Sequence, residues 1–209
     1  MKREALLKVS RVEGITDGLF ATAMTILLFS VQLPEGTTVV NLPTVLTTKI
    51  FEIIVIYAGS FIILGTLWVG SNILHGFLQR VNRQYLWLNI LYLIPAGIVP
   101  FSTSLLIDYP RNTWCITFYV LNLLVSSIFQ ICMWRCGVYY KLYNSAYRPC
   151  VHRLITKRMS VPVLIYIISL IIAPFNTSAA FAILFLQPVF NIMPGRIDRY
   201  ISKRELGFK

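Results

Sequence analysis

The chain has 209 residues, of which 56% are hydrophobic and only 13% are charged, and its formal net charge is +11. About a quarter of the residues in a soluble domain are charged, and the mean hydropathy here is +0.70. The composition therefore excludes an ordinary soluble domain and predicts an all-α membrane protein. The positive charge does not indicate a nucleic-acid partner, because no platform of aromatic and basic residues accompanies it. Basic loops beside anionic lipid headgroups explain it.

The apolar segments predict six transmembrane helices in a single domain, residues 1–209, at about 20 residues per crossing of the lipid bilayer. The predicted spans are 13–33, 48–77, 84–107, 112–138, 159–174 and 177–193. Pro95 and Pro100 interrupt the third span, which is tolerated where neighbouring groups satisfy the freed carbonyls. The last two spans are short and separated only by a turn at 174–177. We expect two crossings there, with a re-entrant hairpin as the alternative.

Basic residues gather in the segments that six crossings place on one side of the membrane. They are Lys2, Arg3, Lys8, Arg11, Arg80, Arg83, Arg135, Lys141, Arg148, Arg153, Lys157, Arg158, Arg196, Arg199, Lys203, Arg204 and Lys209. The opposite side keeps Lys49 and Arg111. The positive-inside rule then places both termini in the cytoplasm, and we expect a multi-pass protein of the cell (plasma) membrane.

Two charged residues, Arg11 and Asp17, stand at the start of the first predicted helix. A charge near lipid is costly without a partner, so an intramembrane carboxylate is a candidate functional residue. The two residues lie about 240° apart around a helix and do not pair with each other. Polar candidates for partners on the second and third helices are Trp68, Ser71, Asn72, His75 and Asn89. We favour a packing network that holds the first helix in place, with a cation site at Asp17 as the alternative.

The first helix also carries two stripes of different character. One is a small-residue stripe that permits close approach of another helix, formed by Gly14, Gly18 and Ala21. The other has spacings of four and three residues and consists of Thr22, Ile26 and Phe29, extended toward the cytoplasm by Arg11 and Ile15. A helix of this kind in a small chain suits a pore shared between subunits around a symmetry axis.

At the same place the sequence resembles a known family. The segment Arg11-Val12-Glu13-Gly14-Ile15-Thr16-Asp17 is similar to the R-x-x-x-F-S-D signature of the transmembrane protein 175 family, potassium channels that lack a TVGYG filter. Ile15 replaces the family's Phe, and Thr16 replaces its Ser. The resemblance covers about residues 8–107 and includes Gly18-Leu19-Phe20-Ala21, Ser60-Phe61, Trp68, Leu86-Trp87-Leu88-Asn89 and Pro100-Phe101.

The resemblance implies a fold and a mechanism. Bacterial members of the family have one six-helix repeat per chain and form homotetramers, in which the first helix of each subunit lines a central pore for potassium ions, without a cofactor. Thr22 occupies the position of the isoleucine that forms the family's narrowest hydrophobic layer, so we expect the constriction to move to Ile26 and Phe29, or conduction at the Thr22 layer to differ. The signature residues are implied to brace the helices; we assign this role to Arg11, Ile15, Thr16, Asp17, Trp68 and Asn89.

Other functions fit the sequence less well. No GxSxG, HExxH or paired-aspartate motif is present, and the only histidines are His75 and His152, so we do not expect an enzyme. The four cysteines match no standard zinc spacing, so we expect no metal. Two alternatives stay open: a secondary transporter, although no internal repeat is visible, and a non-conducting membrane assembly protein.

Overall fold

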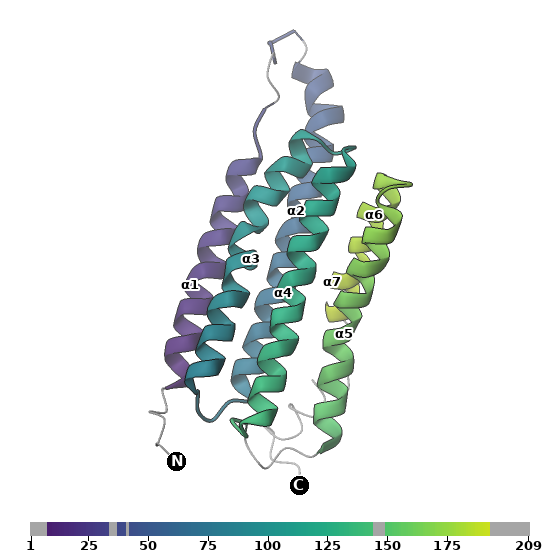
Figure 1. The fold of residues 1–209 in the computed structure, drawn as a ribbon. Helices are drawn as coiled ribbons and strands as arrows, with labels where there is room; N and C mark the ends of the chain where they lie inside the picture. The colour runs from purple at the N-terminus through teal and green to yellow at the C-terminus, as the bar shows by residue number, and fades with distance from the viewer. Residues whose placement is uncertain (1–7, 34–36, 41, 144–148, 193–209) are drawn as a thin grey trace.

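The structure is a computed structural model that describes residues 8–33, 37–40, 42–143 and 149–192. Within these ranges all regular elements are helices, and the only strand-like pairing is one isolated bridge between Leu78 and Tyr143. The elements are α1 (Val9–Leu27), the 3-10 turn η1 (Leu28–Ser30), α2 (Leu42–Gly76), α3 (Arg83–Asp108), α4 (Thr113–Tyr139), α5 (Pro149–Ile172), α6 (Thr177–Leu184) and α7 (Leu186–Ile192) (Figure 1). The prediction of an all-α membrane fold is confirmed.

Three asparagines fix where helices begin. The side-chain oxygens of Asn82, Asn112 and Asn176 accept hydrogen bonds from backbone N–H groups in the first turns of α3, α4 and α6, each at 2.9 Å. Asparagine is favoured at this position because it satisfies one of the four backbone donors that a helix leaves unpaired at its start. The boundaries of these helices are therefore encoded locally.

Five helical segments of the described chain are long and apolar enough to cross a membrane: Val9–Ser30, Leu42–Gly76, Arg83–Asp108, Thr113–Tyr139 and His152–Ile172. They correspond to the first five predicted spans. The third is a continuous helix despite Pro95 and Pro100. The first turns into a 3-10 turn at Leu28 instead of continuing as an α-helix to residue 33, since Ser30 donates its hydroxyl to the Leu27 carbonyl and competes with the helical ladder.

The fifth helix begins earlier than the predicted residue 159. Arg153, Lys157 and Arg158 made this stretch look like a loop, yet α5 already runs through it. Ile155 is buried, which shows that packing against the bundle outweighs the polarity of the neighbouring residues.

The sixth predicted span is the least regular. The described chain holds a shorter apolar helix, Thr177–Asn191, which breaks at Phe185 between α6 and α7. Pro188 explains the break, because its ring removes the N–H that would bond the carbonyl of Leu184. A helix from Thr177 to Asn191 rises roughly 23 Å, less than the ~30 Å of a hydrocarbon core. The expectation of a full sixth crossing is not met by the described residues.

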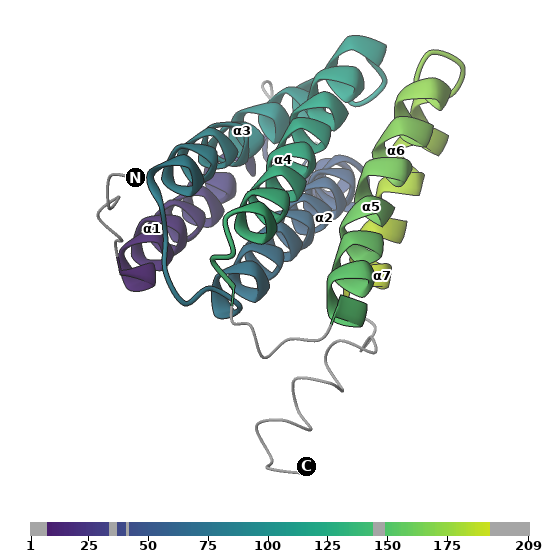
Figure 2. The ribbon, with the colours of Figure 1, turned by 60° about the horizontal axis from the view of Figure 1, so that its bottom comes forward.

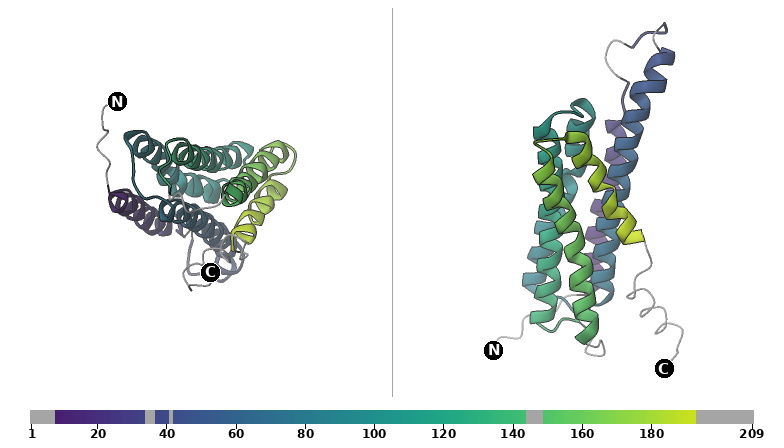
Figure 3. Two further views of the ribbon diagram at one scale, coloured as in Figure 1. Left: turned by 90° about the horizontal axis from the view of Figure 1, so that it is seen from below. Right: turned by 90° about the vertical axis from the view of Figure 1, so that its right-hand side faces the viewer.

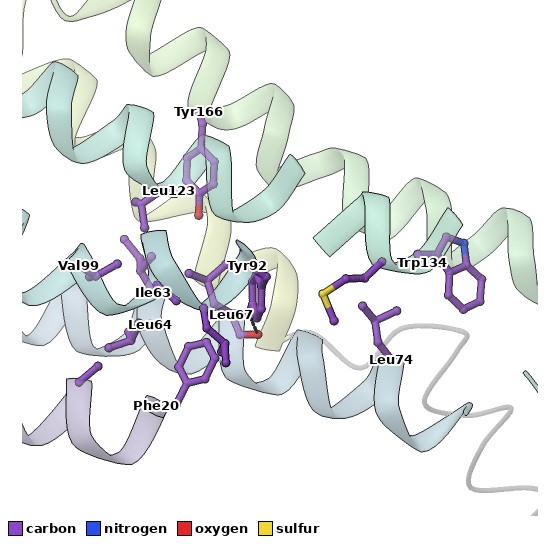
Figure 4. Close-up of a cluster of buried hydrophobic side chains, with 14 of the residues drawn as sticks. Phe20, Ile63, Leu64, Leu67, Leu74, Tyr92, Val99, Leu123, Trp134 and Tyr166 are labelled. Carbon is purple, nitrogen blue, oxygen red and sulfur yellow. Dashed lines mark hydrogen bonds between the residues drawn. The ribbon is translucent and has the colours of Figure 1, made fainter. Parts of the chain in front are cut away.

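The helices pack as a four-helix group with a smaller group beside it. Figures 1 and 2 show α1, α2, α3 and α4 running alongside one another, with α5, α6 and α7 on the opposite side from α1. The core lies where the inner faces of α2, α3 and α4 meet, and Ile63, Leu67, Tyr92, Val99 and Leu123 fill it (Figure 4).

Polar groups in this core are bonded across helices. The carbonyl of Leu67 on α2 accepts from the Tyr92 hydroxyl at 2.8 Å and from the Gln130 amide at 3.2 Å, and the Tyr119 hydroxyl donates to Ser60 at 3.0 Å. In lipid, such bonds spare buried polar groups a large desolvation cost. They hold α2 against both α3 and α4.

The charges of the described residues are distributed unequally between the two ends. The start of α1, the connection from α2 to α3 and the start of α5 lie at one end of the bundle (Figure 1). This end carries Arg11, Arg80, Arg83, Arg135, Lys141, Arg153, Lys157 and Arg158, whereas the other end carries Lys49 and Arg111.

Candidate pore helix

The helix α1 lies at one edge of the bundle and packs on α2 and α3 (Figure 3). Its inner face is buried and follows helical spacing: Val12, Thr16, Phe20, Ala23 and Leu27. Val9, Leu19 and Met24 flank this face and are partly buried, and most other α1 residues are exposed in the described chain. One face of α1 is therefore held in place, and the other is free to contact lipid, water or another subunit.

A polar pair anchors the inner face to α3. Thr16 is 0% exposed and Asn89 is 1% exposed. The Thr16 hydroxyl lies 3.3 Å from the Asn89 amide oxygen and 3.2 Å from its nitrogen, within hydrogen-bond reach of both. Because both side chains are sealed from solvent, each is the partner that satisfies the other. The pair fixes the height and rotation of α1 relative to α3.

A second contact joins α1 to α2. The indole N–H of Trp68 donates to the carboxylate of Asp17 at 2.8 Å. Hydrogen bonds to a charged acceptor are stronger than neutral ones. Arg11 lies near the start of α1, at the basic end of the bundle, and is exposed. Asp17 thus finds its donor on a neighbouring helix, at one of the positions that the sequence singled out.

The other candidate partners behave differently. Ser71 donates to the carbonyl of Trp68 in its own helix at 2.7 Å. His75 is buried, packs edge-on against Tyr85 with ring centroids 6.2 Å apart, and has no hydrogen-bond partner for its ring nitrogens in the described chain. Asn72 is half-buried. Of the five polar groups, the structure therefore bonds Trp68 and Asn89 to α1.

The predicted constriction residues all lie on the uncovered face. Ile15 is 56% exposed, Ile26 49% and Phe29 71%, and Thr22 is also exposed. Phe29 belongs to the 3-10 turn η1, so its direction departs from the α-helical register assumed for it. The stripe is otherwise continuous over successive turns.

The threonines on this face bond to their own helix. The hydroxyl of Thr22 donates to the carbonyl of Gly18, and that of Thr25 to the carbonyl of Ala21, each at 2.8 Å. Each hydroxyl proton is thereby used, while oxygen lone pairs and a methyl group remain on the surface. Thr25 was missed as a site residue; its place three residues after Thr22 was the available signal.

The small-residue stripe has no packing role within the chain. A methyl group added at Gly14 or at Gly18 would meet no heavy atom within 4 Å in the described structure. Glycine inside a helix costs about 1 kcal/mol relative to alanine. The described chain offers no contact that requires these two glycines.

At its outer end, α1 borders a polar cavity of about 650 Å³. The cavity lies between the ends of α1, α2 and α3, and its polar lining includes Ser30, Gln32, Lys49, Glu52, Ser104 and Asp108. Polar and charged side chains therefore line the space beside this end of the helix.

Comparison with known proteins finds similarity to potassium channels. The sequence model for the endosomal/lysosomal potassium channel TMEM175 matches residues 11–100, which contain α1, α2 and most of α3. A potassium channel of Streptomyces collinus is 31% identical over 49% of this chain and 49% of its own length. A potassium channel of a Chryseobacterium species is 23% identical over 92% of this chain and 95% of its own.

The fold has a solved counterpart. The crystal structure of a lysosomal potassium-selective channel TMEM175 homologue from Chamaesiphon minutus superposes with a TM-score of 0.74 at 19% identity, covering 88% of this chain and 95% of that one. The match to the Streptomyces relative spans only about half of that protein. Residues 11–100, the segment that carries the signature and its bonded partners, are thus similar to the TMEM175 family over somewhat less than half of the chain.

Proposed function

We propose that the chain is a potassium-permeable channel, a homotetramer in the cell membrane whose four α1 helices surround a central pore. The observation that carries the proposal is the division of α1 into an inner face anchored by Thr16 and an uncovered face that presents Thr22, Ile26 and Phe29. The names of the relatives, potassium channels, support the choice of ion.

The small-residue stripe supports a shared axis. A methyl group added at Gly14 or Gly18 would meet no heavy atom within 4 Å among the described residues, whereas small residues spaced four apart let helix backbones approach closely in a membrane. In the proposed ring, this stripe contacts the α1 of the next subunit. Contacts of this head-to-tail kind close into rings.

The proposed constriction is hydrophobic. Ile26 from four subunits would form an apolar ring one turn beyond Thr22, a rise of roughly 6 Å. Narrow apolar rings oppose conduction by expelling water. Thr22, whose hydroxyl oxygen keeps lone pairs at the surface, would make the neighbouring layer wettable. No TVGYG filter is needed for this arrangement.

Asp17 and Trp68 are proposed to brace α1 rather than bind the permeating ion, because the carboxylate already accepts the indole N–H. Asp17→Ala should mainly lower assembly or expression, since it removes the acceptor of a charge-assisted bond. A well-folded Asp17→Ala tetramer with altered ion preference would contradict this role and favour a cation site.

Potassium flux into liposomes tests the function. Purified protein under a potassium gradient should give flux, Thr22→Ile should reduce it, and Ile26→Ala should increase leak. Ile128→Ala is the matched control, because Ile128 is similarly exposed but lies on α4. Silence in correctly oriented, folded preparations contradicts a channel, and slow saturable coupled movement identifies a transporter instead.

The mass of the detergent-solubilised complex tests the assembly. We expect a protein mass four times the 23.9 kDa of the chain. Gly18→Leu should lower that mass by blocking close helix approach, whereas Gly76→Leu, at a glycine that also has open space around it, should not. A monomeric wild-type protein would refute the shared pore.

A further inference from the structure

A groove between α3 and α4 lies outside the proposed pore. These helices run side by side along one flank of the bundle (Figures 1 and 3). The groove has a volume of about 450 Å³, within the range of pockets that hold small molecules. It is lined on α3 by Leu91, Pro95 and Ile98 and on α4 by Phe118, Asn122 and Val125.

The groove lies at membrane depth. Pro95 and Asn122 are well inside the candidate spans Arg83–Asp108 and Thr113–Tyr139. Ile98, Phe118 and Val125 are exposed apolar side chains around it. Molecules that reach the groove therefore come from the hydrocarbon part of the bilayer.

Asn122 makes the groove unlike a plain lipid-facing surface. Its side chain is 8% exposed, and its amide nitrogen is buried without a hydrogen-bond partner in the described chain. An amide left unpaired in an apolar environment costs free energy unless something supplies an acceptor. An acyl chain filling the groove would not supply one.

Pro95 adds an acceptor to the same groove. Proline has no backbone N–H, so Pro95 cannot donate to the carbonyl of Leu91 one turn earlier in α3. Leu91 lines the groove together with Asn122. Asn122, with its unpaired amide nitrogen, and Leu91, whose carbonyl receives no bond from Pro95, thus line the same apolar groove.

We infer that this groove binds a membrane-soluble alcohol, a molecule with a long apolar body and a single hydroxyl group. A hydroxyl both accepts and donates, so it accepts from the amide nitrogen of Asn122, once that side chain turns from its buried position toward the groove, and donates to the carbonyl of Leu91. The apolar body occupies the surface between Ile98, Phe118 and Val125. The inference does not depend on the proposed channel function.

Photolabelling of the full-length protein in phosphatidylcholine nanodiscs tests the site. The probes are dodecanol carrying a diazirine and the matching dodecane without the hydroxyl, and peptide mass spectrometry locates the labels. We expect the alcohol to label the α3 and α4 groove peptides about five- to tenfold more than the hydrocarbon, the ratio for one net hydrogen bond. Unlabelled dodecanol should compete, and dodecane should compete less.

Asn122→Leu should abolish the preference for the alcohol while leaving weak labelling by both probes. Thr117→Val, also a loss of a polar group from α4 but outside the groove, should keep it. Equal labelling of the wild type by both probes overturns the inference, as does a preference that survives Asn122→Leu. If neither probe labels the groove and Ile98→Trp lowers the mass of the complex, a second copy of the chain covers the groove. That result also overturns the inference. If Asn122→Leu fails to fold, the competition experiment, which uses the wild type alone, tests the inference. Equal competition by dodecanol and dodecane would overturn it.

Discussion

The bond between Thr16 and Asn89 gives a sharp test of how α1 is held. We predict that Thr16→Val and Asn89→Leu each destabilise the fold, whereas the double variant costs clearly less than the sum of the two. Each single change leaves the other side chain buried without this partner, because the two are 0% and 1% exposed and bond to each other across the α1–α3 interface. The double change removes both polar groups together.

The magnitude follows from burial. A buried polar group left unsatisfied costs about 1–3 kcal/mol, while side-chain hydrogen bonds in a membrane protein average about 0.6 and reach about 1.7 kcal/mol, because the unfolded chain in lipid also finds partners. Because this pair is completely buried, its hydrogen bond should contribute an energy in the upper part of the range measured for membrane proteins. We therefore expect about 1–2 kcal/mol for Thr16→Val and a coupling energy of about 1 kcal/mol.

Equilibrium unfolding in mixed micelles, followed by tryptophan fluorescence, measures these free energies. Thr25→Val is the matched control, since it makes the same substitution on the same helix at an exposed hydroxyl that bonds its own backbone. It should change the free energy of unfolding by less than about 0.5 kcal/mol. Additive effects of Thr16→Val and Asn89→Leu within about 0.3 kcal/mol would refute the reasoning, because contacting partners couple and independent sites do not.

Three further predictions concern other contacts. Trp68→Phe removes the donor to Asp17 and should lower the free energy of unfolding by about 1 kcal/mol in the same assay. The loss is no larger because both residues are exposed. An unchanged free energy of unfolding would show that the bond is not formed. Gly137→Ala would drive a methyl group into the ring of Tyr143 and should lower the free energy of unfolding by about 1–3 kcal/mol. Changing Tyr143 to Leu as well should restore that stability. A Gly137→Ala variant as stable as the wild type would contradict this packing. Ile26→Ala should raise potassium leak in liposomes by about tenfold, which corresponds to about 1.4 kcal/mol of barrier; unchanged flux would remove Ile26 from the constriction.

The sequence by itself determined the class of protein and pointed to the first helix as the candidate site. The low charge and long apolar segments required a membrane fold, because only helices satisfy every backbone group in lipid without an outside partner. The segment from Arg11 to Asp17 indicated a resemblance to the TMEM175 family, whose sequence model matches residues 11–100. Asp17 and Trp68 were correctly proposed as partners, since few polar groups are available to a carboxylate at that depth.

The tertiary structure decided what local patterns could not. Packing of Ile155 made the basic stretch before residue 159 helical, and Pro188 broke the last helix and left it short of a crossing. Hydropathy could not foresee either, because it scores a residue's own polarity and not the neighbours it meets. The pairing of Thr16 with Asn89, and the meeting of Asn122 with Pro95 in one groove, depend on how α1, α3 and α4 are rotated against one another. Those rotations are set by the combined fit of side chains from several helices, a property that no single segment contains.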